Sequence, residues 1–113
     1  MVNRADKVAG LLRRELAAIT QQAFEHEIPR GLFSITDVEV ARDLSHAKVY
    51  VAIYEQDQVE AVMEFLAEHV GAIRHELGKR VRLRIVPTLK FFHDTSSEAG
   101  ARIDELLAKA RRS

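Results

Sequence analysis

The feature that most constrains the fold is a long helical pattern lying between two segments in which apolar and polar residues alternate. Between residues 59 and 77, apolar residues recur every three or four positions, as on one face of an α-helix. They are Val59, Val62, Met63, Leu66, Val70, Ile73 and Leu77. A right-handed helical crossover between two strands of one sheet leaves those strands parallel. The sequence therefore predicts that the last strand lies parallel to the strand before the crossover.

The N-terminal half of the sequence predicts a helix at its start and a regular strand near its end. Apolar residues recur at helical spacing over residues 4–27, which predicts an amphipathic helix. Pro29 and Gly31 then end it. Strict alternation over residues 47–54 predicts a strand with one solvent-facing side. The segment Arg42-Asp43-Leu44-Ser45 before this strand predicts a turn.

The segment that precedes the turn changes phase in its middle. Phe33 and Ile35 would point to one side of an extended chain, whereas Val38 and Val40 would point to the other. This predicts either a bulge at residues 36–37 or a strand that is covered on both faces. With the turn that follows, the two strands should form an antiparallel hairpin.

Two glycines interrupt the crossover pattern. Gly71 predicts a kink between two helices, since glycine inside a helix costs about 1 kcal/mol relative to alanine, and Gly78 ends the second helix. Residues 80–91 alternate again and predict the last strand, with one apolar and one cationic face. The cationic face consists of Arg80, Arg82, Arg84 and Lys90. A capping-box sequence at residues 95–98 predicts a terminal helix over residues 97–113.

These elements together predict a single α+β domain over residues 1–113. The order is helix, strand, strand, helix, kink, helix, strand and terminal helix, and the three strands form a mixed sheet with the helices packed on one face. The chain has 113 residues, of which 47% are hydrophobic, enough for one continuous core. We expect a monomer. We also expect a cytoplasmic location, because no apolar run is long enough to form a signal peptide or to span a bilayer.

The formal net charge of zero conceals two oppositely charged segments. Residues 43–70 contain six acidic residues against Lys48, a net charge of −5. Residues 71–93 contain six basic residues against Glu76, a net charge of +5. A basic end of this kind can meet phosphates, although a dipolar solvated surface is a common feature of small domains that bind no nucleic acid.

The residues that catalysis or a metal would need are missing from the sequence pattern. There is no cysteine, which excludes disulfides, thiolate nucleophiles and cysteine-bound metals. His69 and His75 are six residues apart and so face different directions on a helix. Neither a zinc-protease motif, a serine-hydrolase elbow nor a phosphate-binding glycine loop is present. We therefore expect neither an enzyme nor a cofactor or metal site.

Several sequence strings resemble the ribosome-binding factor A family. They are Val38-Glu39-Val40-Ala41-Arg42-Asp43-Leu44, Ala47-Lys48-Val49-Tyr50-Val51, Arg82-Leu83-Arg84-Ile85-Val86-Pro87-Thr88-Leu89-Lys90-Phe91 and Asp94 through Ser97-Glu98, Gly100 and Arg102-Ile103. The resemblance runs almost end to end. It implies a type II KH-like fold in which a helix, a kink and a second helix replace the GxxG loop that clamps single-stranded RNA in other KH domains. His69, Val70 and Gly71 occupy the place of the kink.

The resemblance also implies a function in ribosome assembly. It implies binding to the free small (30S) ribosomal subunit and to its 16S rRNA, support of rRNA processing and late subunit maturation, and a role in growth at low temperature. From the charge pattern, we expect RNA phosphates to be bound by Arg74, Lys79, Arg80, Arg82, Arg84 and Lys90, with Arg13, Arg14, Arg111 and Arg112 as further candidates. Tyr50, Tyr54 and Phe92 are candidates for stacking on bases, although packing at the sheet edge explains Phe92 equally well.

Two other functions are compatible with the same sequence. The acidic stretch at residues 43–70 could dock a basic ribosomal protein or an assembly GTPase, which would make this a protein-interaction module. A KH-like domain could also be a regulatory RNA-binding module with no link to ribosome assembly, because one fold hosts many functions.

Overall fold

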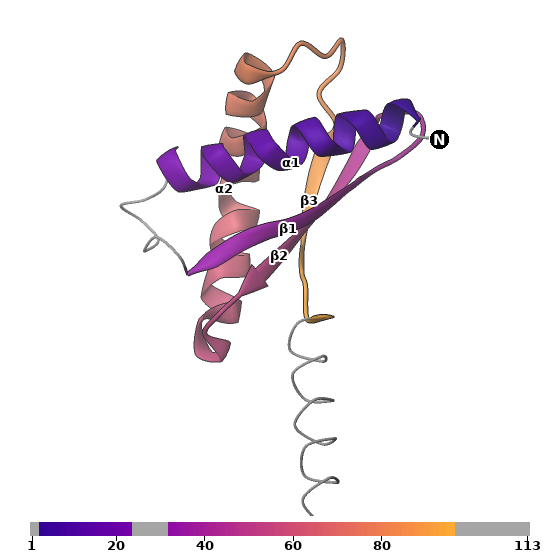
Figure 1. Ribbon diagram of the computed structural model, residues 1–113. Helices are drawn as coiled ribbons and strands as arrows, with labels where there is room; N and C mark the ends of the chain where they lie inside the picture. The colour runs from indigo at the N-terminus through magenta and orange to yellow at the C-terminus, as the bar shows by residue number, and fades with distance from the viewer. Residues whose placement is uncertain (1–2, 24–31, 97–113) are drawn as a thin grey trace, which may run out of the picture.

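The computed structural model describes residues 3–23 and 32–96, which form two helices, three strands and one short 3-10 turn (Figure 1). In chain order these are α1 (Arg4–Ala23), β1 (Phe33–Val40), β2 (His46–Ile53), η1 (Gln56–Gln58), α2 (Val59–Arg80) and β3 (Thr88–His93). None of the helices in this part of the chain combines the length and the hydropathy that crossing a bilayer requires.

The sheet has β2 at its centre, with β1 and β3 on either side. β1 pairs with β2 antiparallel, and β3 pairs with β2 parallel. The hairpin turns at residues 42–45, where Leu44 adopts a left-handed backbone conformation with φ of 63°. The backbone amide of Ala41 donates to the carbonyl of His46 at 2.9 Å and closes the turn. The α+β fold, its mixed sheet and the β1–β2 hairpin, all expected from the sequence, are confirmed.

The phase change in β1 is produced by a bulge. Ile35 pairs with Val51 and Asp37 pairs with Tyr50, so Thr36 has no partner residue on β2. This extra residue turns Val38 to the same side of the sheet as Ile35, and both side chains are buried. The bulge expected at residues 36–37 is therefore confirmed.

The core lies between one face of the sheet and the two helices, both of which pack against it (Figure 1). Its fully buried side chains come from α1, α2 and β2 and include Leu12, Leu16, Ile19, Val49, Val51, Val62, Leu66, Ile73 and Leu77. The apolar positions predicted for the crossover helix are thus largely those that fill the core. Thr20 is the buried polar residue of α1, and its hydroxyl donates to the carbonyl of Leu16 at 2.9 Å.

The crossover is one continuous helix, and the expected division at Gly71 is wrong. α2 runs through Gly71 and Gly78 and ends at Arg80, where the amide of Val81 donates to the carbonyl of Leu77 at 3.0 Å. Ile73 and Leu77 continue the buried stripe beyond Gly71, and burying a leucine or isoleucine contributes about 1.5–3 kcal/mol. This outweighs the roughly 1 kcal/mol that a glycine costs in a helix.

The last strand is shorter than the alternating pattern suggests. β3 begins at Thr88, whereas the sequence predicted a strand over residues 80–91. A strand needs a hydrogen-bonded neighbour, and β2 begins at His46, which is the register partner of Thr88. Residues 81–87 therefore lie opposite the hairpin turn and form a loop. Because Arg80 belongs to α2 and Arg82 and Arg84 belong to this loop, the predicted cationic ladder along one strand is wrong.

Three sequence-based predictions fall outside the described residues. These are the continuation of the first helix over residues 24–27, its end at Pro29 and Gly31, and the terminal helix over residues 97–113 with Arg111 and Arg112.

Candidate nucleic-acid interface

The loop at residues 81–87 carries two of the predicted RNA-binding arginines, and both are free to contact a partner. Arg82 and Arg84 are exposed. Within the described part of the chain, neither side chain forms an ion pair or a hydrogen bond. Ile85 is also 69% exposed, so this loop presents an apolar side chain next to two free guanidinium groups. Such a combination can contact both phosphate and base.

Arg74 holds this loop in place. Its Nε donates to the carbonyl of Pro87 at 3.1 Å and its Nη2 donates to the carbonyl of Val86 at 2.6 Å. A planar guanidinium suits such a two-pronged contact, which a lysine ammonium cannot reproduce. We therefore regard Arg74 as a positioning residue for the loop.

Arg80 and Lys79 lie in the last turn of α2 but differ in how free their charged groups are to bind a phosphate. The Arg80 guanidinium lies 3.5 Å from Glu76 and 3.8 Å from Glu15, and it donates to Gln22 at 3.2 Å. These contacts join α2 to α1, so Arg80 acts mainly within the protein. The Lys79 side chain is 63% exposed and only its long 3.9 Å contact with Glu76 restrains it.

The parallel pairing of β2 and β3 brings further cations to the loop. The two parallel strands begin at the same end of the sheet, so the turn before β2 meets the loop before β3. A hollow of about 200 Å³ lies between them, and Arg4, Leu44, Ser45, Arg84 and Ile85 are among its lining residues. The fold thus adds the start of α1 to the candidate site.

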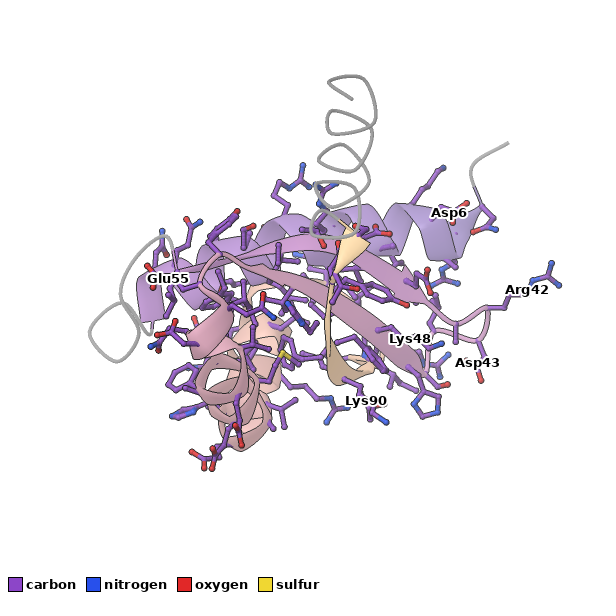
Figure 2. The ribbon with its side chains drawn as sticks, turned by 90° about the horizontal axis from the view of Figure 1, so that it is seen from below. Asp6, Arg42, Asp43, Lys48, Glu55 and Lys90 are labelled. Carbon is purple, nitrogen blue, oxygen red and sulfur yellow. The ribbon has the colours of Figure 1, made fainter. Side chains whose placement is uncertain are left out.

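We refer to the exposed cations of this region as the basic edge. They are Arg4, Arg42, Lys48, Arg82, Arg84 and Lys90. Figure 2 shows Arg42 and Lys48 on one side of the molecule together with Asp43 and Asp6, Lys90 nearer the middle, and Glu55 on the opposite side. Sequence reasoning missed Arg4, Arg42 and Lys48, although the predicted parallel strands already implied that the turn at residues 42–45 lies beside the segment before the last strand.

Asp43 is the carboxylate that interrupts the basic edge, and it is tied to its own turn. It accepts hydrogen bonds from the Ser45 hydroxyl at 2.6 Å and from the Ser45 amide at 3.1 Å. The hydrogen bond from the Ser45 side chain is the main reason that the pKa of Asp43 is lowered. The carboxylate therefore stabilises the left-handed turn at Leu44 while remaining charged.

Arg13 and Arg14 lie elsewhere, on the exposed side of α1. Arg13 lines a hollow of about 460 Å³ together with Asp6, Asp37 and Glu39. These acidic neighbours make that hollow a poor place for a phosphate. The structure therefore does not add Arg13 to the basic edge.

The acidic residues of the crossover form the other end of the molecule. Glu55, Asp57, Glu60, Glu64 and Glu68 are all exposed and lie on η1, next to it or on the first half of α2. A helix rises about 1.5 Å per residue, so about 30 Å separates Glu60 from Arg80. The charge asymmetry of the sequence thus becomes a spatial asymmetry along α2.

The predicted kink residues have a local role inside α2. The His69 ring stacks on Phe65 with a centroid distance of 4.1 Å, and His69 Nδ1 lies 2.9 Å from the Phe65 carbonyl. Gly71 is exposed and no atom lies within 4 Å of the position that a Cβ would occupy.

Residues 3–23 and 32–96 contain no group of three histidine or acidic side chains that could hold a metal ion.

Comparison with known proteins identifies the family. The family model described as ribosome-binding factor A matches residues 4–107. The chain belongs to the ribosome-binding factor A family. A ribosome-binding factor A from Gloeothece citriformis is 42% identical over 106 residues, which cover 92% of this chain and 81% of that protein. The resemblance inferred from the sequence is thereby confirmed.

Solved structures of ribosome-binding factor A share the same fold. The crystal structure of the Thermus thermophilus protein has a TM-score of 0.69 at 27% identity and covers 80% of this chain and 97% of that chain. A homology model of the Thermus thermophilus protein, fitted into the cryo-EM map of a complex with the 30S subunit, has a TM-score of 0.67 at 30% identity. It covers 78% of this chain and 92% of that chain.

Proposed function

We propose that this chain binds the small ribosomal subunit through 16S rRNA and assists its late maturation, without catalysing a reaction itself. Membership of the ribosome-binding factor A family supports this, as does the fit of the Thermus thermophilus relative into a 30S complex. We further propose that it acts in the cytoplasm as a monomeric single domain over residues 1–113, that it supports rRNA processing, and that it matters most for growth at low temperature.

The observation that carries the proposal is the pair of free arginines on the 81–87 loop. Arg82 and Arg84 are exposed and unpaired within the described residues, and Arg4, Arg42 and Lys48 surround the same edge. Each phosphate that such cations neutralise releases counterions, so binding should weaken steeply with salt. In this proposal Arg82, Arg84 and Lys90 contact RNA directly, Lys79, Arg13 and Arg14 add weaker contacts, and Arg74 and Arg80 hold the surface in shape.

Co-sedimentation with purified small subunits tests the proposal. We expect the double variant Arg82→Glu with Arg84→Glu to lose at least about tenfold in affinity and to have a shallower salt dependence. The comparison variant is Arg13→Glu with Arg14→Glu, which changes the net charge equally on α1 and should lose less affinity, because these residues add only weaker contacts in the proposal. Thermal unfolding followed by circular dichroism would verify that both variants fold.

Two outcomes would contradict the proposal. Equal losses in the two double variants would mean that only net charge matters. Wild-type protein that stays free of small subunits at low ionic strength would reject the function altogether.

A second candidate function rests on the acidic end. Glu60, Glu64 and Glu68 recur every four residues on the exposed side of α2 and form a row that a basic protein could bind. Binding to naked 16S rRNA fragments separates the two candidates, because an RNA-binding factor should retain part of its affinity when the ribosomal proteins are removed.

A further inference from the structure

The face of the sheet that points away from the helices carries an aromatic pair beside a lysine pair. Tyr50 on β2 and Phe92 on β3 are register partners, and their ring centroids lie 5.7 Å apart at an interplanar angle of 30°. Lys48 and Lys90 are register partners two residues earlier, so they share this face. Figure 2 shows Lys48 and Lys90 on neighbouring strands.

The hydrophobic core does not account for these two rings. Phe91 packs against the core, so the next residue, Phe92, points to the opposite face. Tyr50 lies between Val49 and Val51, which are both fully buried, and it too points away from the core. Both rings are only half-buried.

Polar contacts hold the rings in position. The Tyr50 hydroxyl donates to Glu39 at 3.3 Å, and Lys90 Nζ lies 5.5 Å from the centroid of the Phe92 ring. These contacts set the orientation of Tyr50 and place a cation beside Phe92. The surface is therefore ordered before any partner arrives.

We propose that Tyr50 and Phe92 form a stacking platform for unpaired bases of an RNA strand whose phosphates contact Lys48 and Lys90. Aromatic side chains on adjacent strands of an open sheet can stack successive bases, because every base offers a flat π-face. A duplex keeps its bases stacked on one another, so the platform selects single-stranded RNA. The inference rests on the proposed function and names the kind of RNA that this surface takes.

Charge restricts where such a strand can lie. Glu39 and Asp37 occupy the β1 side of the same face, opposite Lys48 and Tyr50 in the strand register. Both disfavour a phosphate backbone over β1, and Asp94, whose charge also acts on Tyr50, limits the path beyond Phe92. Lys48 and Lys90 belong to the basic edge, so a strand held there by Arg84 can continue across β2 and β3 onto the rings.

Intrinsic fluorescence can test the platform directly. The protein has no tryptophan and two tyrosines, Tyr50 and Tyr54. Tyr54 is 65% exposed and its hydroxyl is 2.7 Å from the Ser34 hydroxyl, so Tyr54→Phe should preserve the fold. The Tyr54→Phe protein then reports on Tyr50 alone.

The probes are three RNA hexamers of equal charge, namely hexaadenylate, hexauridylate and an abasic ribose-phosphate hexamer, added at low salt. We expect hexaadenylate to quench Tyr50 strongly and saturably, hexauridylate to quench it less, and the abasic hexamer not to quench it. Hexamers that fail to bind, binding without quenching, or equal affinity for hexaadenylate and the abasic hexamer would each overturn the platform.

Two sets of variants separate stacking from charge. Phe92→Leu should weaken hexaadenylate binding by roughly 5- to 150-fold and leave the abasic hexamer unaffected, since stacking is worth about 1–3 kcal/mol per base. Lys48→Gln with Lys90→Gln should weaken binding of all three hexamers. Phe65→Leu, the same substitution on α2, is the matched control and should change the affinity for neither hexaadenylate nor the abasic hexamer.

The result can be distinguished from failure of the proposed function. If wild-type protein sediments with small subunits but hexaadenylate does not quench Tyr50, the platform is wrong and the proposed function stands. If hexaadenylate quenches Tyr50 while the protein ignores small subunits, the surface binds single-stranded RNA in another context.

Discussion

At the scale of single residues, Asp94 links three parts of the sheet. Its carboxylate accepts hydrogen bonds from the Thr36 hydroxyl at 2.7 Å and from the Ser96 hydroxyl at 2.6 Å, and the Ser96 amide adds a third at 3.0 Å. Its own amide donates to the carbonyl of Val51 at 2.7 Å. Asp94 thereby fastens the bulge of β1 to the end of β3, across β2.

These hydrogen bonds predict a pH dependence of stability. They lower the pKa of Asp94 from 3.8 to about 2, the largest effect coming from the Ser96 side chain, followed by that of Thr36. Between these two values the unfolded chain binds more protons than the folded one, so the contribution of Asp94 is present above pH 3.8 and is lost as the pH falls through about 2. Urea unfolding of the wild type and of Asp94→Asn should therefore differ most at pH 5, and the difference should shrink toward pH 2. A difference that is independent of pH would contradict this role of Asp94.

At the scale of elements, α2 shows how packing decides whether a glycine breaks a helix. The buried stripe of Leu66, Ile73 and Leu77 passes Gly71 without a change of phase. Gly71 itself is exposed, and a Cβ there would meet no atom within 4 Å. The helix therefore tolerates this glycine at a modest cost in backbone entropy.

This predicts that Gly71→Ala stabilises the protein. We expect a gain of about 0.5–1 kcal/mol in the free energy of unfolding, because alanine loses less backbone entropy and fits the space. Gly10→Ala in α1 is the matched control, since no atom lies within 4 Å of its Cβ position either. If Gly71→Ala destabilises while Gly10→Ala stabilises, α2 bends at Gly71 in solution, as the family resemblance implied.

The 81–87 loop depends on α2 for its conformation. Arg74 donates to two consecutive carbonyls of the loop, those of Val86 and Pro87. We expect Arg74→Lys and Arg74→Gln to lower the free energy of unfolding by a similar amount, about 1 kcal/mol, because lysine keeps the charge but not the planar fork. Both should also weaken binding to small subunits by displacing Arg82 and Arg84. Wild-type stability and binding in Arg74→Lys would show instead that Arg74 acts through its charge.

At the scale of the whole molecule, the charges are separated along α2. The exposed carboxylates of its first half lie at one end, whereas the basic edge lies near its C-terminal end. In Figure 1, α2 runs from its start at the bottom of the view to the 81–87 loop at the top. Such a dipolar molecule can orient itself before it touches an anionic surface.

Neutralising the acidic end tests this long-range effect. The triple variant Glu60→Gln, Glu64→Gln and Glu68→Gln removes three negative charges that lie about 18–30 Å along α2 from its C-terminal end at Arg80. The Debye length is about 30 Å at 0.01 M salt and about 10 Å at 0.1 M. We expect this variant to bind 16S rRNA fragments several-fold faster at 0.01 M salt and at the wild-type rate at 0.1 M. A faster rate that persists at 0.1 M would place the acidic residues near the bound RNA.

Local sequence patterns determined which residues face the core. The alternation over residues 47–54, the helical spacing of Leu66 to Leu77 and the phase change at residues 36–37 each depend on neighbouring side chains alone. The helical spacing and the phase change were interpreted correctly because burial of apolar surface acts along one element at a time. The alternation holds up to Val51, but Ala52, which the pattern placed on the solvent-facing side, is buried. The parallel last strand followed from the crossover between them.

Tertiary structure decided where the last strand begins and which cations meet. The alternating residues 81–87 look like a strand, yet β2 has no residue before His46 with which they could pair, so they form a loop. That loop lies beside Arg4 and the hairpin turn, which are far from it in the sequence. A pattern within one segment carries no information about the length of its partner, because backbone hydrogen bonds between strands need both chains. For this reason the sequence by itself determined the faces of the elements, whereas only the pairing of β2 with β3 assembled the basic edge.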